Sequence, residues 1–371
     1  MNPNLFLPDY TNSILGIPNS ILAHYGAKPH HPTLPALDEK LCKGYKNVVL
    51  LVLDGLGDNL LNAHAPDGFL ADHRVSALSS VYPSTTASAL TTLESGLTPI
   101  EHGWLGWSGW FEEAGENVEL FTNKIYGTDR SAAEHSLAWM KLPYKNLFTQ
   151  VREASPDVET CRVSPFGEYW CDTNEALCSH IEILCKKGGR RYIYAYHFQP
   201  DTDEHVYGCY GERVKADVAL FDRQLERLAA SLSDTLLIVT ADHGLIDIQM
   251  RDIEETPDLF ECLAIPPTRE PRSLSLFVKE ERKTEFPRRW NARFGGDYIL
   301  MTGDEAVHNP IFGPGTPHPR ARGFLGDYTA LATGKVSVWF RNAQGVSKGY
   351  KALHAGLCRD EMVVPLVLVE R

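Results

Sequence analysis

Acidic residues and histidines recur along the chain at positions where they could bind metal ions. The set comprises Asp201, His205, Asp242, His243 and His354. Carboxylate oxygens together with imidazole nitrogens form the ligand set that suits zinc and related divalent ions. Each residue or pair taken alone is common in proteins, where it often serves only as a helix cap or a turn. The set therefore has chemical meaning only if the fold brings its members together.

Three largely apolar runs end just before residues of this kind and predict the strands that would position them. These runs are residues 47–53, 191–197 and 235–240. Apolar, β-branched runs without alternation are typical of strands that are buried on both faces of a parallel sheet. Because the carboxyl ends of parallel strands meet at one edge of the sheet, we expect Asp54, Asp201 and Asp242 to converge there.

Helical segments are expected between these strands, at residues 85–96, 174–187 and 213–233. In the last of them, apolar residues recur at alternating spacings of four and three. Alternation of strand and helix predicts an α/β fold with a mainly parallel central sheet flanked by helices.

The domain organisation is expected to combine one core with an insertion. Residues 46–245 and 327–371 are assigned to the core, with strands returning to it at 336–340 and 363–369. Residues 246–326 are rich in proline, arginine and irregular sequence, which indicates an inserted smaller subdomain. Residues 1–45 are interpreted as an N-terminal extension that packs on the core.

Composition and charge exclude several classes of protein. The chain has 371 residues, of which 43% are hydrophobic and 23% charged, so disorder, collagen-like repeats and coiled coil are disfavoured. The formal net charge of −12 argues against a nucleic-acid polymer or an anionic membrane as partner. A small anionic substrate would need local positive charge, such as a bound metal ion.

The sequence contains no recognisable export signal or membrane span. Its N-terminus lacks a basic segment followed by an apolar one, and the longest apolar runs are far shorter than the ~18–20 residues of a spanning helix. The eight cysteines form no CxxC pair, so we expect reduced thiols rather than disulfides or a zinc module. These features predict a cytoplasmic protein.

A possible nucleophile stands at the expected start of a helix. Residues 82–86 read Tyr-Pro-Ser-Thr-Thr, and a helix N-terminus presents free N–H groups that favour a phosphate. A threonine hydroxyl attacks well only when a metal ion or a base lowers its pKa. The alternative is that Ser84 or Thr85 merely caps the helix.

Five motifs in order carry a resemblance to a known family. They are LxLDG at 51–55, YPSTT…SGLTPIEHG at 82–103, PDxxxH at 200–205, ADHG at 241–244 and HAGLCRDEMVVPL at 354–366. With them the chain resembles the alkaline phosphatase superfamily, and within it the type I phosphodiesterase/nucleotide pyrophosphatase branch. Residues 1–45 and 246–326 carry no motif.

The resemblance implies a centre of two divalent ions, with zinc as the first expectation and manganese as the alternative. One ion would be held by Asp201, His205 and His354. The other would be held by Asp54, Asp242, His243 and the oxygen of the nucleophile. By its distance from the proline of the motif the nucleophile is Thr86, with Thr85 as the alternative assignment.

The activity implied is hydrolysis of phosphodiester or phosphoanhydride bonds through Thr86. Residues 87–90 offer no arginine for a third phosphoryl oxygen, which favours diesters over monoesters. The alternatives are a phosphomonoesterase or phosphonate hydrolase of the same superfamily, and a metal-binding scaffold without activity. The C/S-x-P-x-R arrangement of sulfatases is absent.

The chain departs from the family after His102-Gly103, where an asparagine that donates to a phosphate oxygen is missing. Tryptophans stand instead at 104, 107 and 110, and Trp107 falls near the asparagine's place. We expect Trp104 and Trp107, together with Trp110, to form a wall on which substrate stacks, with simple core packing as the alternative.

Overall fold

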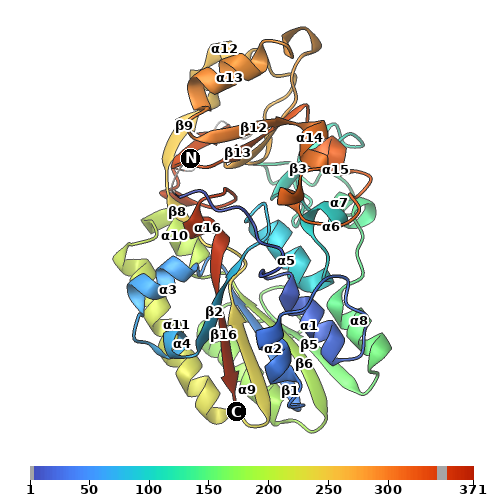
Figure 1. Cartoon of the computed structure of the whole chain (residues 1–371), viewed down its shortest axis with the longest axis vertical. Coiled ribbons are helices and arrows are strands. Elements are labelled where there is room, and N and C mark those ends of the chain that lie inside the picture. Colours follow the sequence, from blue (N-terminus) through green and yellow to red (C-terminus); the bar gives the residue numbers. More distant parts are fainter. Residues whose placement is uncertain (1–3, 341–348) are drawn as a thin grey trace.

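The computed structural model describes residues 4–340 and 349–371. Figure 1 shows a larger part built around a central sheet, with a smaller part above it. The three apolar clusters of the described residues follow this arrangement, since the largest surrounds the central sheet and the two others lie in the smaller part.

The central sheet has six strands in the order β2-β16-β7-β1-β6-β5. Their bounds are β2 (Arg74–Ser79), β16 (Val363–Glu370), β7 (Thr235–Thr240), β1 (Asn47–Leu53), β6 (Arg190–His197) and β5 (Val158–Val163). β16 pairs antiparallel with both β2 and β7, and the other pairs of this sheet are parallel. All residues of β1 are buried, as a strand at the centre of a sheet covered on both faces requires. The predicted α/β fold with a mainly parallel sheet is confirmed.

Two groups of helices flank this sheet, each with internal contacts. One contains α1 (Gly16–His24), α2 (Pro35–Leu41), α5 (Thr86–Ser95) and α8 (Leu147–Ala154). The other contains α3 (Asp58–His64), α4 (Phe69–Asp72), α9 (Asn174–Lys186), α10 (Asp201–Tyr207) and α11 (Glu212–Ser231). In Figure 1 α1, α2 and α8 lie on one side of the strands and α3, α4 and α11 on the other. The predicted helices correspond to α5, α9 and α11.

The N-terminal segment packs against the central core. Ile14, Ile17 and Ile21 are fully buried and belong to the same apolar cluster as β1. Asn12 and Ser79 are joined by a backbone hydrogen bond, and Ile14 donates to the carbonyl of Ser79. Residues of this segment therefore contribute to the core.

The smaller part is built on a four-stranded antiparallel sheet of order β10-β11-β13-β12. Its strands are β10 (Thr268–Glu270), β11 (Ser273–Leu276), β13 (Tyr328–Ala332) and β12 (Tyr298–Thr302). Two-stranded pairs form between β14 (Val336–Trp339) and β9 (Gln249–Asp252), β15 (Ala352–Leu353) and β8 (Ile246–Asp247), and β3 (Ser108–Phe111) and β4 (Glu116–Glu119). The short helices of this region are α6 (Pro99–His102), α7 (Leu137–Lys141), α12 (Pro257–Phe260), α13 (Phe286–Phe294), α14 (Gly303–Val307) and α15 (Ala321–Phe324), with 3₁₀ turns η1 (Ile253–Glu255), η2 (Glu280–Arg282) and η3 (Pro310–Phe312). The last helix, α16 (Arg359–Met362), leads back into β16.

The expected domain boundaries need correction. β13 lies inside the smaller sheet and β14 pairs with β9, so the return to the core expected at residue 327, with a strand at 336–340, is wrong. The chain rejoins the central sheet only at β16. Residues 99–142, expected in the core, also contribute to an apolar cluster of the smaller part. A short apolar run has the same appearance in either sheet, so its pattern could not distinguish them.

None of the helices in the described ranges is long and apolar enough to cross a membrane. All eight cysteines lie in those ranges and are free thiols, six of them buried.

Candidate active site

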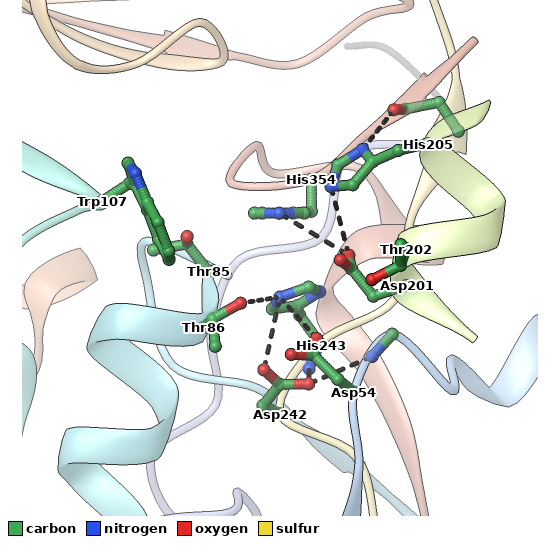
Figure 2. Close-up of polar contacts among 12 residues, drawn as sticks. Asp54, Thr85, Thr86, Trp107, Asp201, Thr202, His205, Asp242, His243 and His354 are labelled. Atoms are coloured by element: carbon green, nitrogen blue, oxygen red, sulfur yellow. Dashed lines mark hydrogen bonds and ion pairs between the residues drawn. The ribbon is translucent and has the colours of Figure 1, made fainter. Parts of the chain in front are cut away.

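The three strands at the centre of the main sheet deliver acidic residues to one edge. β7, β1 and β6 are neighbours, and the residues that follow them are Asp242, Asp54 and, at the start of α10, Asp201. The carboxyl ends of parallel strands place these side chains together, as Figure 2 shows. The predicted convergence is therefore present.

A glycine permits the closest of these approaches. Gly55 has a φ of 78°, and a Cβ on it would lie 2.8 Å from the Cα of Asp201. The backbone N–H of Asp201 donates to the carbonyl of Asp54 over 3.0 Å. Only a residue without a side chain fits here, so the LDG motif brings the loop after β1 against the start of α10.

Asp54, Asp242 and His243 form one group whose ligand atoms lie within 4.8 Å of one another. His243 Nε2 is 3.5 Å from Asp54 Oδ1 and 3.4 Å from Asp242 Oδ2. The hydroxyl of Thr86 lies 3.2 Å from the same nitrogen. This is the group expected to bind the ion next to the nucleophile.

Asp201, His354 and His243 form a second group by the same distance criterion. His354 Nε2 is 3.8 Å from Asp201 Oδ1, and His205 Nε2 is 3.4 Å from that oxygen. His205 Nδ1 also lies 2.8 Å from the carbonyl of Ala352, which points Nε2 toward the aspartate. The geometry thus places His205 beside this group, while His243 borders both.

The chemistry of the groups fits divalent cations. Asp54 Oδ1, Asp201 Oδ1 and Asp242 Oδ2 are buried and have no hydrogen-bond partner. Buried carboxylate oxygens without partners are costly unless a cation compensates them. Two ions in these groups would supply that compensation and the positive charge that the chain as a whole lacks.

The pKa shifts reflect the same crowding of charge. Burial raises the pKa of Asp54 well above its usual value, and the charges of Asp242 and Asp201 raise it further. Burial also raises the pKa of Asp242. Burial and the neighbouring His243 lower the pKa of His354, which keeps its imidazole neutral. Neutral imidazole is the form that binds a metal ion.

Thr85 and Thr86 have different surroundings. Thr85 is fully buried and donates its hydroxyl to Glu270 Oε1 over 2.8 Å. Thr86 is the first residue of α5 and faces the two aspartate–histidine groups (Figure 2). The hydroxyl of Thr85 caps no N–H of α5, so the helix N-terminus keeps its free donors next to Thr86.

A cleft of about 320 Å³ opens above Thr86, Asp201, His205 and His354. Trp107 lines it, as expected. Trp104 does not, and its expected role in substrate binding is wrong. Its side chain is fully buried, its indole N–H donates to the carbonyl of Leu142 over 3.0 Å, and it packs on the rings of Phe121, Trp139 and Tyr144. Trp110 is likewise absent from the lining of the cleft.

Two further residues of the site were not found from the sequence. Tyr196 donates its hydroxyl to Asp54 Oδ2, and its place next to Val52 in the parallel register could have indicated it. Glu270 comes from β10 of the smaller sheet, and its Oε1 accepts the backbone N–H of Trp107 over 2.6 Å. Burial raises the pKa of Glu270 to about 7. It lies in an irregular stretch without any motif, so no signal pointed to it.

Residues 48–265 match the family described as type I phosphodiesterase/nucleotide pyrophosphatase. This match covers more than half of the chain. The chain belongs to the type I phosphodiesterase/nucleotide pyrophosphatase family. Membership confirms the resemblance to the alkaline phosphatase superfamily and identifies the chain as a phosphoester hydrolase of a metal-dependent family. No curated protein matches the sequence.

Solved structures of this family type share the fold. Human ectonucleotide pyrophosphatase/phosphodiesterase 5 aligns with a TM-score of 0.65 at 14% identity, covering 87% of each chain. An inactive form of the murine protein in complex with AMP aligns with a TM-score of 0.60 at 15% identity, covering 86% of this chain and 87% of that one. Phosphonoacetate hydrolase from Sinorhizobium meliloti, in complex with phosphonoformate, aligns with a TM-score of 0.64 at 15% identity, covering 87% of this chain and 89% of that one.

Proposed function

We propose that this chain hydrolyses small phosphodiesters with Thr86 as nucleophile. Two divalent ions, for which zinc is the first choice, would bind to the two aspartate–histidine groups. The observation that carries the proposal is the position of the Thr86 hydroxyl, at the N-terminus of α5 and 3.2 Å from His243 Nε2. Thr85, the alternative nucleophile, is fully buried and hydrogen-bonded to Glu270.

The metal-binding residues would be divided as the two groups suggest. Asp54, Asp242 and His243 would hold the ion next to Thr86, and Asp201 with His354 and His205 would hold the other. Divalent ions at these places would lower the pKa of the Thr86 hydroxyl and neutralise charge on the phosphoryl oxygens.

The reaction would proceed by two displacements at phosphorus. First, Thr86 Oγ1 loses its proton to water and forms a bond to phosphorus while the bond from phosphorus to the leaving oxygen breaks. The leaving alkoxide takes up a proton from water and departs as the alcohol. Water then attacks the phosphothreonine and restores the hydroxyl. The free N–H groups of the first turn of α5 face the phosphoryl oxygens during both steps and stabilise their negative charge.

The lining of the cleft supports a diester over the alternatives of the same superfamily. A monoester dianion exposes three oxygens, and among the described lining residues no arginine or lysine is present to bind the third. A phosphonate with a carboxylate group would meet Glu119 and Glu270 in the same cleft, where like charges repel. A scaffold without activity would have no use for a Thr86 hydroxyl that lines the cleft.

Metal content and substrate preference together test this proposal. Protein prepared without chelator should contain about two zinc or manganese ions per chain by elemental analysis. Asp54→Asn and Asp201→Asn should each lose one ion. Asp203→Asn should keep both, because Asp203 lies on α10 but its carboxylate pairs with Arg213 outside the groups. An aryl phosphodiester should be cleaved in preference to the aryl monoester. One ion or none, or a preference for the monoester, would contradict the proposal.

A further inference from the structure

The part of the cleft beyond the metal-binding groups has an unusual lining. It combines four aromatic side chains with two carboxylates, namely Trp107, Tyr126, Trp339, Tyr350, Glu119 and Glu270. We call these six residues the acidic aromatic pocket. They come from the β3–β4 hairpin and the loop after it, from β10, from β14 and from the residue pair before β15.

The charged side chains of this pocket are both carboxylates. Within the described ranges no lysine or arginine lines the cleft, and neither Glu119 nor Glu270 forms an ion pair there with one. Glu270 is only 7% exposed, and its Oε1 accepts hydrogen bonds from Thr85 and Trp107. A buried carboxylate whose hydrogen-bond donors are neutral attracts a cation from the cleft.

The aromatic rings adjoin both the carboxylates and the metal-binding side. The Tyr350 ring centroid lies 4.8 Å from that of His205 and 5.9 Å from that of Trp339. Tyr126 lines the cleft together with both carboxylates. Burial raises the pKa of its hydroxyl, and the charges of Glu270 and Glu119 raise it further. In the view of Figure 2, Trp107 lies to the left of Thr86 and the histidines to the right.

We propose that the acidic aromatic pocket binds an alkylammonium group carried by the substrate. This inference rests on the proposed function, since it assigns the second organic group of the phosphodiester. Aromatic faces attract quaternary or protonated ammonium groups, and carboxylates beside them complete the charge pairing. The phosphoryl group would sit at Thr86 and the cation in the pocket, within one continuous cleft.

The same lining disfavours other substituents. A second phosphate or a carboxylate would face Glu119 and Glu270 without a compensating base among the described residues. A nucleobase could stack on Trp107, but a neutral base brings no positive charge to pair with the two carboxylates. The pocket therefore selects for positive charge.

Three matched aryl diesters test the inference. Each is a p-nitrophenyl phosphate ester whose second group is 2-trimethylammonioethyl, its neutral isostere 3,3-dimethylbutyl, or the anionic 2-carboxyethyl. We expect kcat/KM for the ammonium ester to exceed that for the isostere by tenfold or more, with the anionic ester slowest. In Glu270→Gln and Glu119→Gln the ratio of ammonium ester to isostere should fall several-fold toward one. A merely structural role of these residues would lower both rates together and leave the ratio unchanged.

Controls separate this inference from the proposed function. Glu112→Gln removes an exposed carboxylate of the same hairpin that does not line the cleft, and its ratio should equal that of the wild type. Binding is measured independently of turnover, by calorimetry with choline and with 3,3-dimethylbutanol. If no diester is cleaved but choline binds at least tenfold more tightly than 3,3-dimethylbutanol, the proposed function is wrong while the inference about the pocket is supported. Equal binding of choline and 3,3-dimethylbutanol, together with equal rates for the ammonium ester and its neutral isostere, would overturn the inference. A preference for the p-nitrophenyl ester of thymidine monophosphate would also overturn it.

Discussion

Arg272 and Glu361 form a buried ion pair that joins the smaller sheet to the C-terminal part of the core. Arg272 Nε lies 2.6 Å from Oε1 of the glutamate and Nη2 lies 2.7 Å from Oε2, with both side chains fully buried. Glu361 also accepts the backbone N–H groups of Gly356 and Cys358, at 2.8 and 3.2 Å. The pair therefore shapes the loop that carries His354.

Removing one partner of this pair should destabilise the protein and loosen the metal-binding groups. Arg272→Met leaves the charge of Glu361 buried and unpaired, and a cost of about 3–5 kcal/mol in unfolding free energy is expected. Urea unfolding measures this loss, and elemental analysis should show weaker retention of metal. The double variant Arg272→Met/Glu361→Leu should recover much of the stability, because no unpaired charge remains. A single variant as stable as the wild type would show that the pair does not hold the two parts together.

The two neighbouring threonines should respond differently to substitution. Thr86→Ala should lower kcat by about a thousandfold or more, because it removes the attacking oxygen. Thr86→Ser should keep part of the activity. Thr85→Ala should be much milder, since it removes only the hydrogen bond to Glu270. Acid quenching during turnover, followed by peptide mass spectrometry, should find the phosphoryl group on Thr86. Finding it on Thr85, or an inactive Thr85→Ala with an active Thr86→Ala, would reverse the assignment.

The tryptophans at 104 and 107 should separate into a packing residue and a cleft residue. Trp104→Ala empties a fully buried site and should cost about 3–5 kcal/mol of unfolding free energy. Trp107→Ala should cost clearly less and act mainly on KM, because Trp107 is half-buried and lines the cleft. Thermal or urea unfolding together with steady-state kinetics distinguishes the two. Equal stability losses would place both side chains in the core.

Glu370 should make a pH-dependent contribution to stability at the end of β16. Hydrogen bonds from Lys43, Tyr45 and Lys40 lower the pKa of its carboxyl from 4.5 to about 2. A lowered pKa in the folded state means that the contribution is complete above the unfolded pKa of 4.5 and is lost as the pH falls toward 2. The urea midpoint of Glu370→Gln should thus lie below that of the wild type at pH 7, and the difference should shrink between pH 4.5 and pH 3. Glu226→Gln, on the exposed face of α11, should show no such trend. A constant difference across this range would contradict the assignment of the lowered pKa.

The convergence of the aspartates at one edge of the sheet was predictable from the sequence. Asp54, Asp201 and Asp242 each come after a run that is typical of a buried strand, and the carboxyl ends of parallel strands meet at one edge of the sheet. Short-range rules of this kind need no knowledge of distant contacts. The helix that begins at Thr86 was predictable on the same basis, because a proline followed by hydroxyl residues marks its start locally.

Which residues form the opposite wall of the cleft depends on the tertiary structure alone. Glu270 and Trp339 belong to short strands of a second sheet, and a run of three to five residues does not reveal which sheet it joins. The tryptophans at 104 and 107 are three residues apart in one loop, yet one is buried among aromatic rings while the other faces the cleft. No local period governs an irregular loop, so only the packing of the smaller part against the core determines which side chain meets the substrate.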